Sequence, residues 1–158
     1  MSTPEERRIL ITKIETLPGI LEATVAELSD KQLDTPYRDG GWTVRQVVHH
    51  LCDSHMNAFL RFKLMLNEEK PLIKTYDQDV WAASKEYGMP IVGALALLRG
   101  LHERWHVLVN SIPEEGWGRT AMHPENGEIT LDRMLTIYGN HGEKHCMQIK
   151  GLRDRMNW

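Results

Sequence analysis

Histidines are the residues of this 158-residue chain whose types and spacing most directly suggest chemistry. The chain has eight of them, and four stand in two pairs with i,i+4 spacing: His102 and His106 in HERWH, and His141 and His145 in HGEKH. Two histidines four residues apart share one face of a helix and can bind the same metal ion. Because chance alone predicts about 0.4 such pairs for this composition, each pair must be judged by its surroundings.

The string HERWH matches the zinc-protease signature H-E-x-x-H, whose Glu is the general base. Helical-wheel arithmetic puts His102 on the apolar face, His106 at its edge and Glu103 on the outer side, away from any inward-facing metal. No third His follows at the metzincin spacing. The same residues spell E-x-x-H, but di-iron bundles need that element twice and the chain has it once. We therefore expect HERWH not to be a metal site.

The string HGEKH lies differently on its helix. His141 and His145 both fall on the apolar face, whereas Glu143 points away from it and is expected to be a solvated carboxylate. A buried polar group without a partner costs roughly 1–3 kcal/mol, so two inward-facing rings need partners. A metal ion shared by His141 and His145 would satisfy both rings.

Such a metal needs at least a third ligand, and the segment VVHHLCDSH offers His49, His50 and His55. Helical arithmetic places His55 nearest the middle of the apolar face, His50 towards its border and His49 at or beyond it. Periodicity alone therefore favours His55, with His50 second.

The elements that must position these residues are helical. Apolar residues recur at three- and four-residue spacing, and alternation of period two is nearly absent. Thr3 and Glu6 form a predicted capping box for a first helix from Pro4 to about Leu28, which Pro18-Gly19 should bend or break. Three further long helices are predicted over about 44–66, which Thr43 and Gln46 cap, and about 91–112 and 130–155.

The connections are long and polar. Residues 29–42 have the composition of a loop, a short helix is possible in DQDVWAAS, and Asn126-Gly127 can close a small hairpin. The sequence thus predicts an all-α protein: a single domain over residues 1–158, folded as a four-helix bundle with long connecting loops, in which sites form from inward-pointing side chains.

Charge and composition restrict the class of protein. The 19 basic and 22 acidic residues are interspersed and give a net charge of −3, which disfavours nucleic acid as a partner. The N-terminus MSTPEERRIL is charged where a signal peptide is apolar, and no apolar run is long enough to span a bilayer. We expect a soluble, cytoplasmic protein without a membrane partner, in which Cys52 and Cys146 are unpaired thiols.

Four stretches together resemble the YfiT-type metal-dependent hydrolases of the DinB superfamily: SDKQLDTPYRDGGWTVRQVVHHLCDSHMNAFLRFKL, LHERW, HPENGEITL and YGNHGEKHCMQI. The resemblance covers nearly the whole chain. It implies a DinB-like four-helix bundle, usually a homodimer, with one divalent metal per chain held by three His. Matched residue by residue, the implied ligands are His50, His141 and His145, and HERWH supplies none. His50 thereby replaces His55 as the expected third ligand.

The implied site suggests two chemistries. Three neutral imidazoles leave a tetrahedral metal with one open position, where water becomes acidic enough to act in hydrolysis. A thiol at that position would be deprotonated, as a thiol S-transferase requires, and some members of the superfamily are such enzymes. Zinc is the expected metal, with nickel or another first-row ion as alternatives. The expected activity is hydrolysis of a small molecule, S-transfer is the alternative, and a non-enzymatic metal-binding role is third.

The sequence assigns no general base. The second nitrogen of each ligand imidazole needs a hydrogen-bond acceptor. Asp53, Tyr138 and Asn140 lie near the ligands in sequence, but their spacing does not select one.

Overall fold

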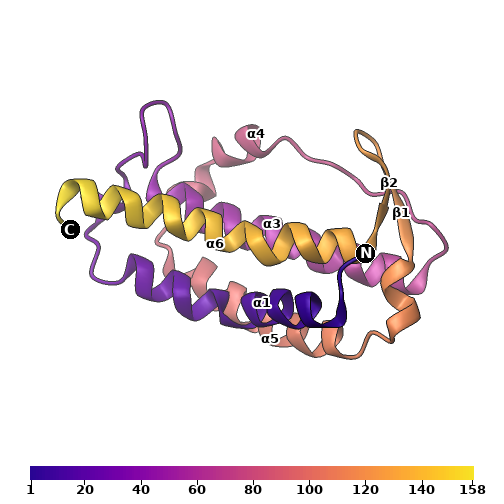
Figure 1. The fold of residues 1–158 in the computed structure, drawn as a ribbon. Coiled ribbons are helices and arrows are strands. Elements are labelled where there is room, and N and C mark those ends of the chain that lie inside the picture. Colours follow the sequence, from indigo (N-terminus) through magenta and orange to yellow (C-terminus); the bar gives the residue numbers. More distant parts are fainter.

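Four long helices run side by side and make up most of the molecule (Figure 1). The structure is a computed structural model and describes residues 1–158. It confirms the predicted all-α four-helix bundle with long connecting loops. The four helices are α1 (Pro4–Val25), α3 (Val44–Asn67), α5 (Val92–Asn110) and α6 (Leu131–Met156).

Short elements fill the connections. They are α2 (Asp30–Leu33), α4 (Gln78–Ala82), the 3-10 helices η1 (Lys85–Gly88) and η2 (Glu114–Gly118), and the strands β1 (Thr120–His123) and β2 (Gly127–Thr130). The antiparallel hairpin is confirmed, with His123 opposite Gly127, whose φ of 69° suits a residue without a side chain. Helix α4 lies within the predicted DQDVWAAS segment. Helix α2 was not predicted, because the polar segment around it looked like a loop.

The predicted capping boxes begin two of the long helices. The Thr3 side chain accepts a hydrogen bond from the Glu6 backbone N–H, and the Thr43 side chain accepts one from Gln46. In both helices the side-chain oxygen of the third residue in turn accepts a hydrogen bond from the cap backbone N–H, so two N–H groups that lack helical partners are satisfied at each start. The start of α3 is therefore well defined only seven residues before His50.

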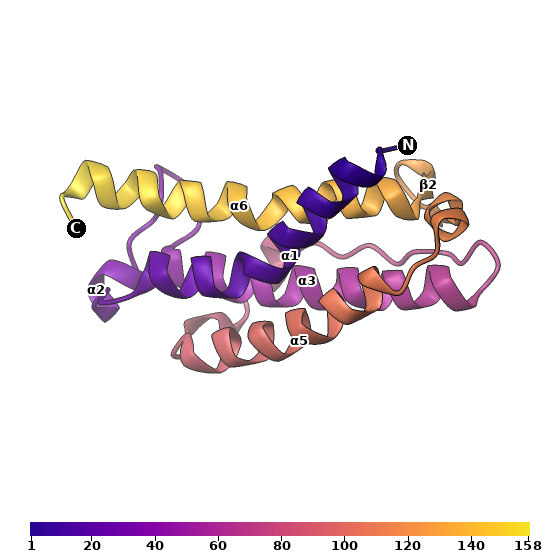
Figure 2. The ribbon, with the colours of Figure 1, turned by 60° about the horizontal axis from the view of Figure 1, so that its bottom comes forward.

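Helix α1 continues through Pro18, so the predicted break is wrong and the predicted bend is confirmed. Figure 2 shows α1 changing direction part-way along its length. Proline has no backbone N–H, so the carbonyl four residues earlier, that of Ile14, loses its helical donor. That carbonyl instead receives a hydrogen bond from the Nδ1 of His102 on α5. A side chain from another helix thus satisfies the backbone group that Pro18 leaves open.

The core consists of two apolar clusters that follow one another along the bundle. One contains Trp105 and the other contains Leu51, and each draws on all four long helices. Between them, three helices place a buried or half-buried histidine: His55 on α3, His102 on α5 and His141 on α6. We call these three residues the histidine layer, and they interrupt an otherwise apolar interior.

Helix α1 packs closely against α6. A side chain at Gly142 would overlap that of Leu17, and one at Gly139 would meet the Leu10 side chain and backbone. The absence of a side chain at both positions therefore lets the two helices approach. This close contact fixes the helix that carries His141 and His145 against α1.

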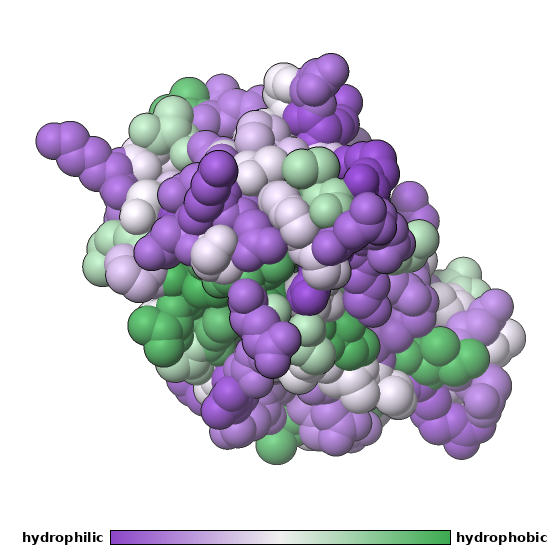
Figure 3. Space-filling view, turned by 90° about the vertical axis from the view of Figure 1, so that its left-hand side faces the viewer, coloured by the Kyte–Doolittle hydropathy of each residue, from purple (hydrophilic) through white to green (hydrophobic).

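The surface mixes charged and apolar groups. Figure 3, which views one end of the bundle, shows mostly hydrophilic residues with smaller apolar areas between them. None of the helices combines the length and the apolar character needed to cross a membrane. Cys52 and Cys146 are buried and unpaired, as predicted, and burial raises the pKa of each thiol to about 11. Neither is therefore a reactive thiolate at neutral pH.

Candidate metal centre

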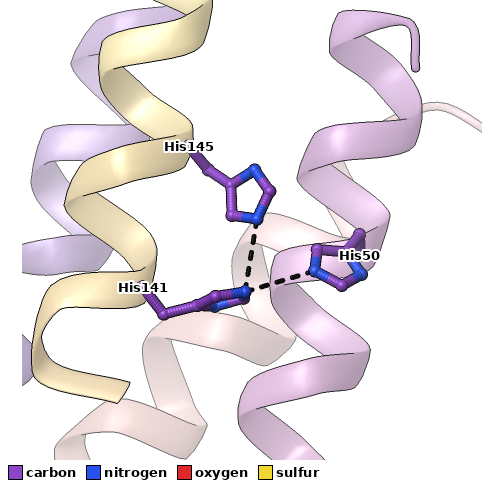
Figure 4. Close-up of side chains that lie close together, drawn as sticks. All are labelled: His50, His141 and His145. Atoms are coloured by element: carbon purple, nitrogen blue, oxygen red, sulfur yellow. Dashed lines mark hydrogen bonds between the residues drawn. The ribbon is translucent and has the colours of Figure 1, made fainter. Parts of the chain in front are cut away.

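The three histidines implied by the family resemblance come together in the structure. His50 projects from α3, and His141 and His145 project from α6, one helical turn apart (Figure 4). The Nε2 atom of His141 lies 3.4 Å from the Nε2 of His50 and 3.2 Å from the Nε2 of His145. One ligand atom from each residue lies within 4.8 Å of the others, and no Asp, Glu or Cys joins this cluster.

These distances fit a bound metal ion. Two nitrogens at about 2.05 Å from a tetrahedral zinc lie about 3.3 Å apart, close to the observed separations. The Nδ1 of His145 lies 2.8 Å from the Gln148 side-chain oxygen, which can only accept a hydrogen bond, so the His145 proton is on Nδ1. The Nε2 atom of His145 therefore points a lone pair at His141. A metal ion bound beside it would accept this lone pair.

Burial keeps the cluster uncharged. Burial first, and then the charge of neighbouring groups such as His145, lower the pKa of His50 to about 3 and that of His141 to about 3. Burial also lowers the pKa of His145, against a hydrogen bond to Gln148 that raises it. Neutral imidazole is the form that binds metal, so protons compete little for these nitrogens near pH 7. The Nδ1 of His50 is buried without a hydrogen-bond partner.

The other histidines have different surroundings. His55 is fully buried, as helical arithmetic predicted, but its Nε2 contacts the Nδ1 of His141 at 3.2 Å rather than joining the three Nε2 atoms. His49 contacts the backbone oxygen of Met89. The apolar periodicity thus identified an inward-facing residue, but it did not distinguish a neighbour of the cluster from a member.

The string HERWH contributes no member to the cluster. His102 is buried in the histidine layer, His106 is half-buried near Asn110, and Glu103 is exposed, as predicted. Glu143, between the two histidines of α6, pairs with Lys13 on the surface, also as predicted. The geometry that a zincin requires is absent at HERWH.

The three acceptors suggested by sequence proximity have other partners. Asp53 accepts a hydrogen bond from the Tyr87 hydroxyl, Asn140 accepts one from Lys13, and the Tyr138 hydroxyl accepts one from Arg61. Sequence reasoning missed Gln148 as a partner of His145, although its i,i+3 spacing on the same helix could have revealed it.

Sequence reasoning also missed Trp42, whose ring covers the cluster. Its centroid lies 4.6 Å from that of His50, and it stacks parallel to the His145 ring at 6.4 Å. The Trp42 indole N–H donates to Asp79 at 3.1 Å, which ties the loop before α3 to α4. Trp42 is half-buried and follows Gly40 and Gly41 in a loop, and no pattern in this part of the sequence predicted its contact with the histidine cluster.

A pocket of about 420 Å³ opens over the cluster. His141 and His145 line it, together with Trp42 and the loop that precedes Trp42. Arg38 and Lys144 bring positive charge to the pocket, whereas Asp79 is engaged by Trp42. A small molecule in this pocket would lie against two of the three clustered imidazoles.

We expect the free energy of unfolding of the metal-free protein to fall as the pH drops below about 6.5. Burial lowers the pKa of His102 to about 4, whereas an unfolded chain's histidine titrates near 6.5. Between these values the unfolded state binds more protons, so the stability that His102 contributes above pH 6.5 is lost as the pH falls towards 4. The loss approaches about 1.4 kcal/mol per pH unit.

Urea unfolding across this pH range measures the effect. The His102→Leu protein lacks one of the titrating groups and should show a shallower dependence than the wild type. An equal dependence in the two proteins would contradict the assignment to His102.

Comparisons with known proteins find a matching family and similar relatives. The profile of the family described as "DinB superfamily" matches residues 13–149. A protein from Oceanobacillus iheyensis, named "putative metal-dependent hydrolase", is 47% identical over 148 residues, which are 94% of this chain and 86% of that protein. A Bacillus anthracis protein with the same description matches at the same identity and coverage.

A solved structure has the same fold. It is YfiT from Bacillus subtilis, with a TM-score of 0.97 and 44% identity over 100% of this chain and 91% of that one. That protein is described as "a probable metal-dependent hydrolase with an unusual four-helix bundle topology". With a family match over most of its length and relatives at 47% identity, this chain belongs to the DinB superfamily.

Proposed function

We propose that this protein is a metal-dependent hydrolase that holds one divalent cation through the Nε2 atoms of His50, His141 and His145. The observation that carries the proposal is the proximity of these three nitrogens, which all belong to neutral rings. The Nε2 of His141 lies 3.4 Å from that of His50 and 3.2 Å from that of His145. Similar proteins are named "putative metal-dependent hydrolase" and "probable metal-dependent hydrolase", which supports the same activity for this chain. Zinc is the metal we propose first, because imidazole suits it well and three protein ligands leave a position open.

The chain's own residues have distinct parts in this proposal. A metal ion so held supplies Lewis acidity and activates water near neutral pH. Gln148 holds the His145 ring with its proton on Nδ1, so that Nε2 is available. Trp42 covers the imidazoles and limits their exposure to water. Arg38 and Lys144 lie where they can orient polar or anionic groups of a substrate in the pocket.

Removal of the metal should abolish activity. We expect the metal-loaded protein to hydrolyse at least one member of a panel of small esters, amides and lactones, to lose that activity after dialysis with a chelator, and to regain it with zinc or nickel. Metal-free protein as active as the loaded form would leave the metal a structural role and refute the proposal.

The same panel separates the alternative, thiol S-transfer. A hydrolase turns over without added thiol, whereas an S-transferase is silent until a low-molecular-weight thiol and an electrophile are supplied. Running each substrate with and without thiol on one preparation of loaded protein therefore distinguishes the two activities.

A further inference from the structure

The histidine layer forms a continuous hydrogen-bonded row that ends at the cluster. Its first contact joins the Nδ1 of His102 to the Ile14 carbonyl, which Pro18 deprives of a helical donor. A carbonyl oxygen can only accept, so the Nδ1 of His102 carries a proton. Burial holds the pKa of His102 at about 4, so the ring is neutral at pH 7 and its Nε2 must accept.

The next two hydrogen bonds follow from this assignment of donor and acceptor. The Nδ1 of His55 lies 2.9 Å from the Nε2 of His102 and donates to it. His55 is fully buried and its two ring nitrogens contact only other imidazoles, so no counter-charge supports a charged ring, and its Nε2 presents a lone pair to the Nδ1 of His141 at 3.2 Å. His141 therefore holds its proton on Nδ1. Its Nε2, which faces His50 and His145, carries the lone pair.

The row is shielded from bulk water. His55 and His102 are 0% and 1% exposed, and their rings lie nearly parallel, with centroids 5.0 Å apart and an angle of 18° between planes. Apolar residues close the layer on both sides, with Cys52 and Ala58 flanking His55 on α3, and Leu98 and Trp105 flanking His102 on α5. Because solvent does not reach these rings, each one depends on its neighbour in the row for its hydrogen bonds.

We propose that His55 and His102 are positioning residues, which fix the tautomer and orientation of His141 and thereby strengthen metal binding. The inference rests on the proposed metal site and extends it by two residues, one of them from the HERWH string. In metal sites, the hydrogen-bond partner on the second nitrogen of a ligand imidazole typically contributes 10- to 100-fold to metal affinity. In this protein the partner of His141 is the His55 imidazole. The position of the His55 proton is set by His102, whose own proton is held by the Ile14 carbonyl.

Substitutions at His55 test the row. In His55→Leu neither nitrogen remains, and we expect zinc affinity, measured by competition with a chromophoric chelator, to fall about 10- to 100-fold. In His55→Gln the amide oxygen can accept from His141 and the amide N–H can donate to His102, so affinity should recover towards that of the wild type. His106→Leu is the matched control, because His106 lies on α5 outside the row, and its affinity should not change.

The tautomers give a second, direct readout. In metal-free wild-type protein, 15N NMR of the imidazole nitrogens should show His141 protonated at Nδ1 and not at Nε2. His55→Leu should show both tautomers of His141. A wild-type His141 protonated at Nε2 would overturn the proposal even if the Leu variant failed to fold.

The outcomes also separate this inference from the metal site itself. Wild-type zinc affinity in a folded His55→Leu protein would overturn the row and leave the site intact. A wild-type protein that bound no zinc would overturn the site and with it the role of the row.

Discussion

Replacing His50 by alanine is expected to reduce bound zinc from about one ion per chain to near zero in dialysed protein. Two remaining imidazoles, both on α6, are fewer protein ligands than catalytic zinc sites use. His141→Ala should have the same effect, because the Nε2 of His141 is the atom that lies close to both other ligands. Elemental analysis of the purified variants measures the metal content.

His49→Ala is the matched control for His50→Ala. The two residues are adjacent on α3, but the Nε2 of His49 contacts the backbone oxygen of Met89 and is not part of the cluster. Its metal content should equal that of the wild type. Full metal retention by His50→Ala would refute the ligand assignment and return His55 as the candidate.

Trp105→Ala should destabilise the folded protein strongly. Trp105 is fully buried. The centroid of its ring lies 5.3 Å from that of Phe62 and 5.6 Å from those of His55 and His102. Removing such a side chain leaves a cavity in a packed core and typically costs about 3–5 kcal/mol. Urea denaturation of the metal-free protein would measure the loss of unfolding free energy.

Trp81→Ala applies the same substitution at a more open position. Trp81 is 36% exposed and stacks on Tyr76, so its removal creates no enclosed cavity and should cost under about 1 kcal/mol. Equal losses in the two variants would show that Trp105 does not organise the core. The Trp105 indole nitrogen has no hydrogen-bond partner, so Trp105→Phe should recover much of the lost stability.

Local patterns in the sequence predicted most of the fold. The apolar spacing located all four long helices. The capping boxes at Thr3 and Thr43 correctly predicted where two of these helices begin. Helix α2 was missed although Ser29 and Gln32 form a capping box of the same kind, because a four-residue helix has too little apolar periodicity to stand out from a polar loop.

Long-range contacts account for what the sequence did not predict. Pro18 bends α1 without breaking it, since the carbonyl that loses its donor is satisfied by His102, 88 residues away. A break and a bend look alike in the local sequence. The position of His50 is a similar case, because helical periodicity shows which side chains face inward but not how far along the bundle each one meets its neighbours.

The histidine layer also has a consequence for how the helices are aligned lengthwise. Apolar side chains of similar size are partly interchangeable, so an apolar interface alone permits helices to slide past one another. A slide of one turn, about 5.4 Å, would separate His55 from His102 and His141 and leave buried imidazoles unpaired, at roughly 1–3 kcal/mol each. We therefore expect the layer to set the register of α3, α5 and α6.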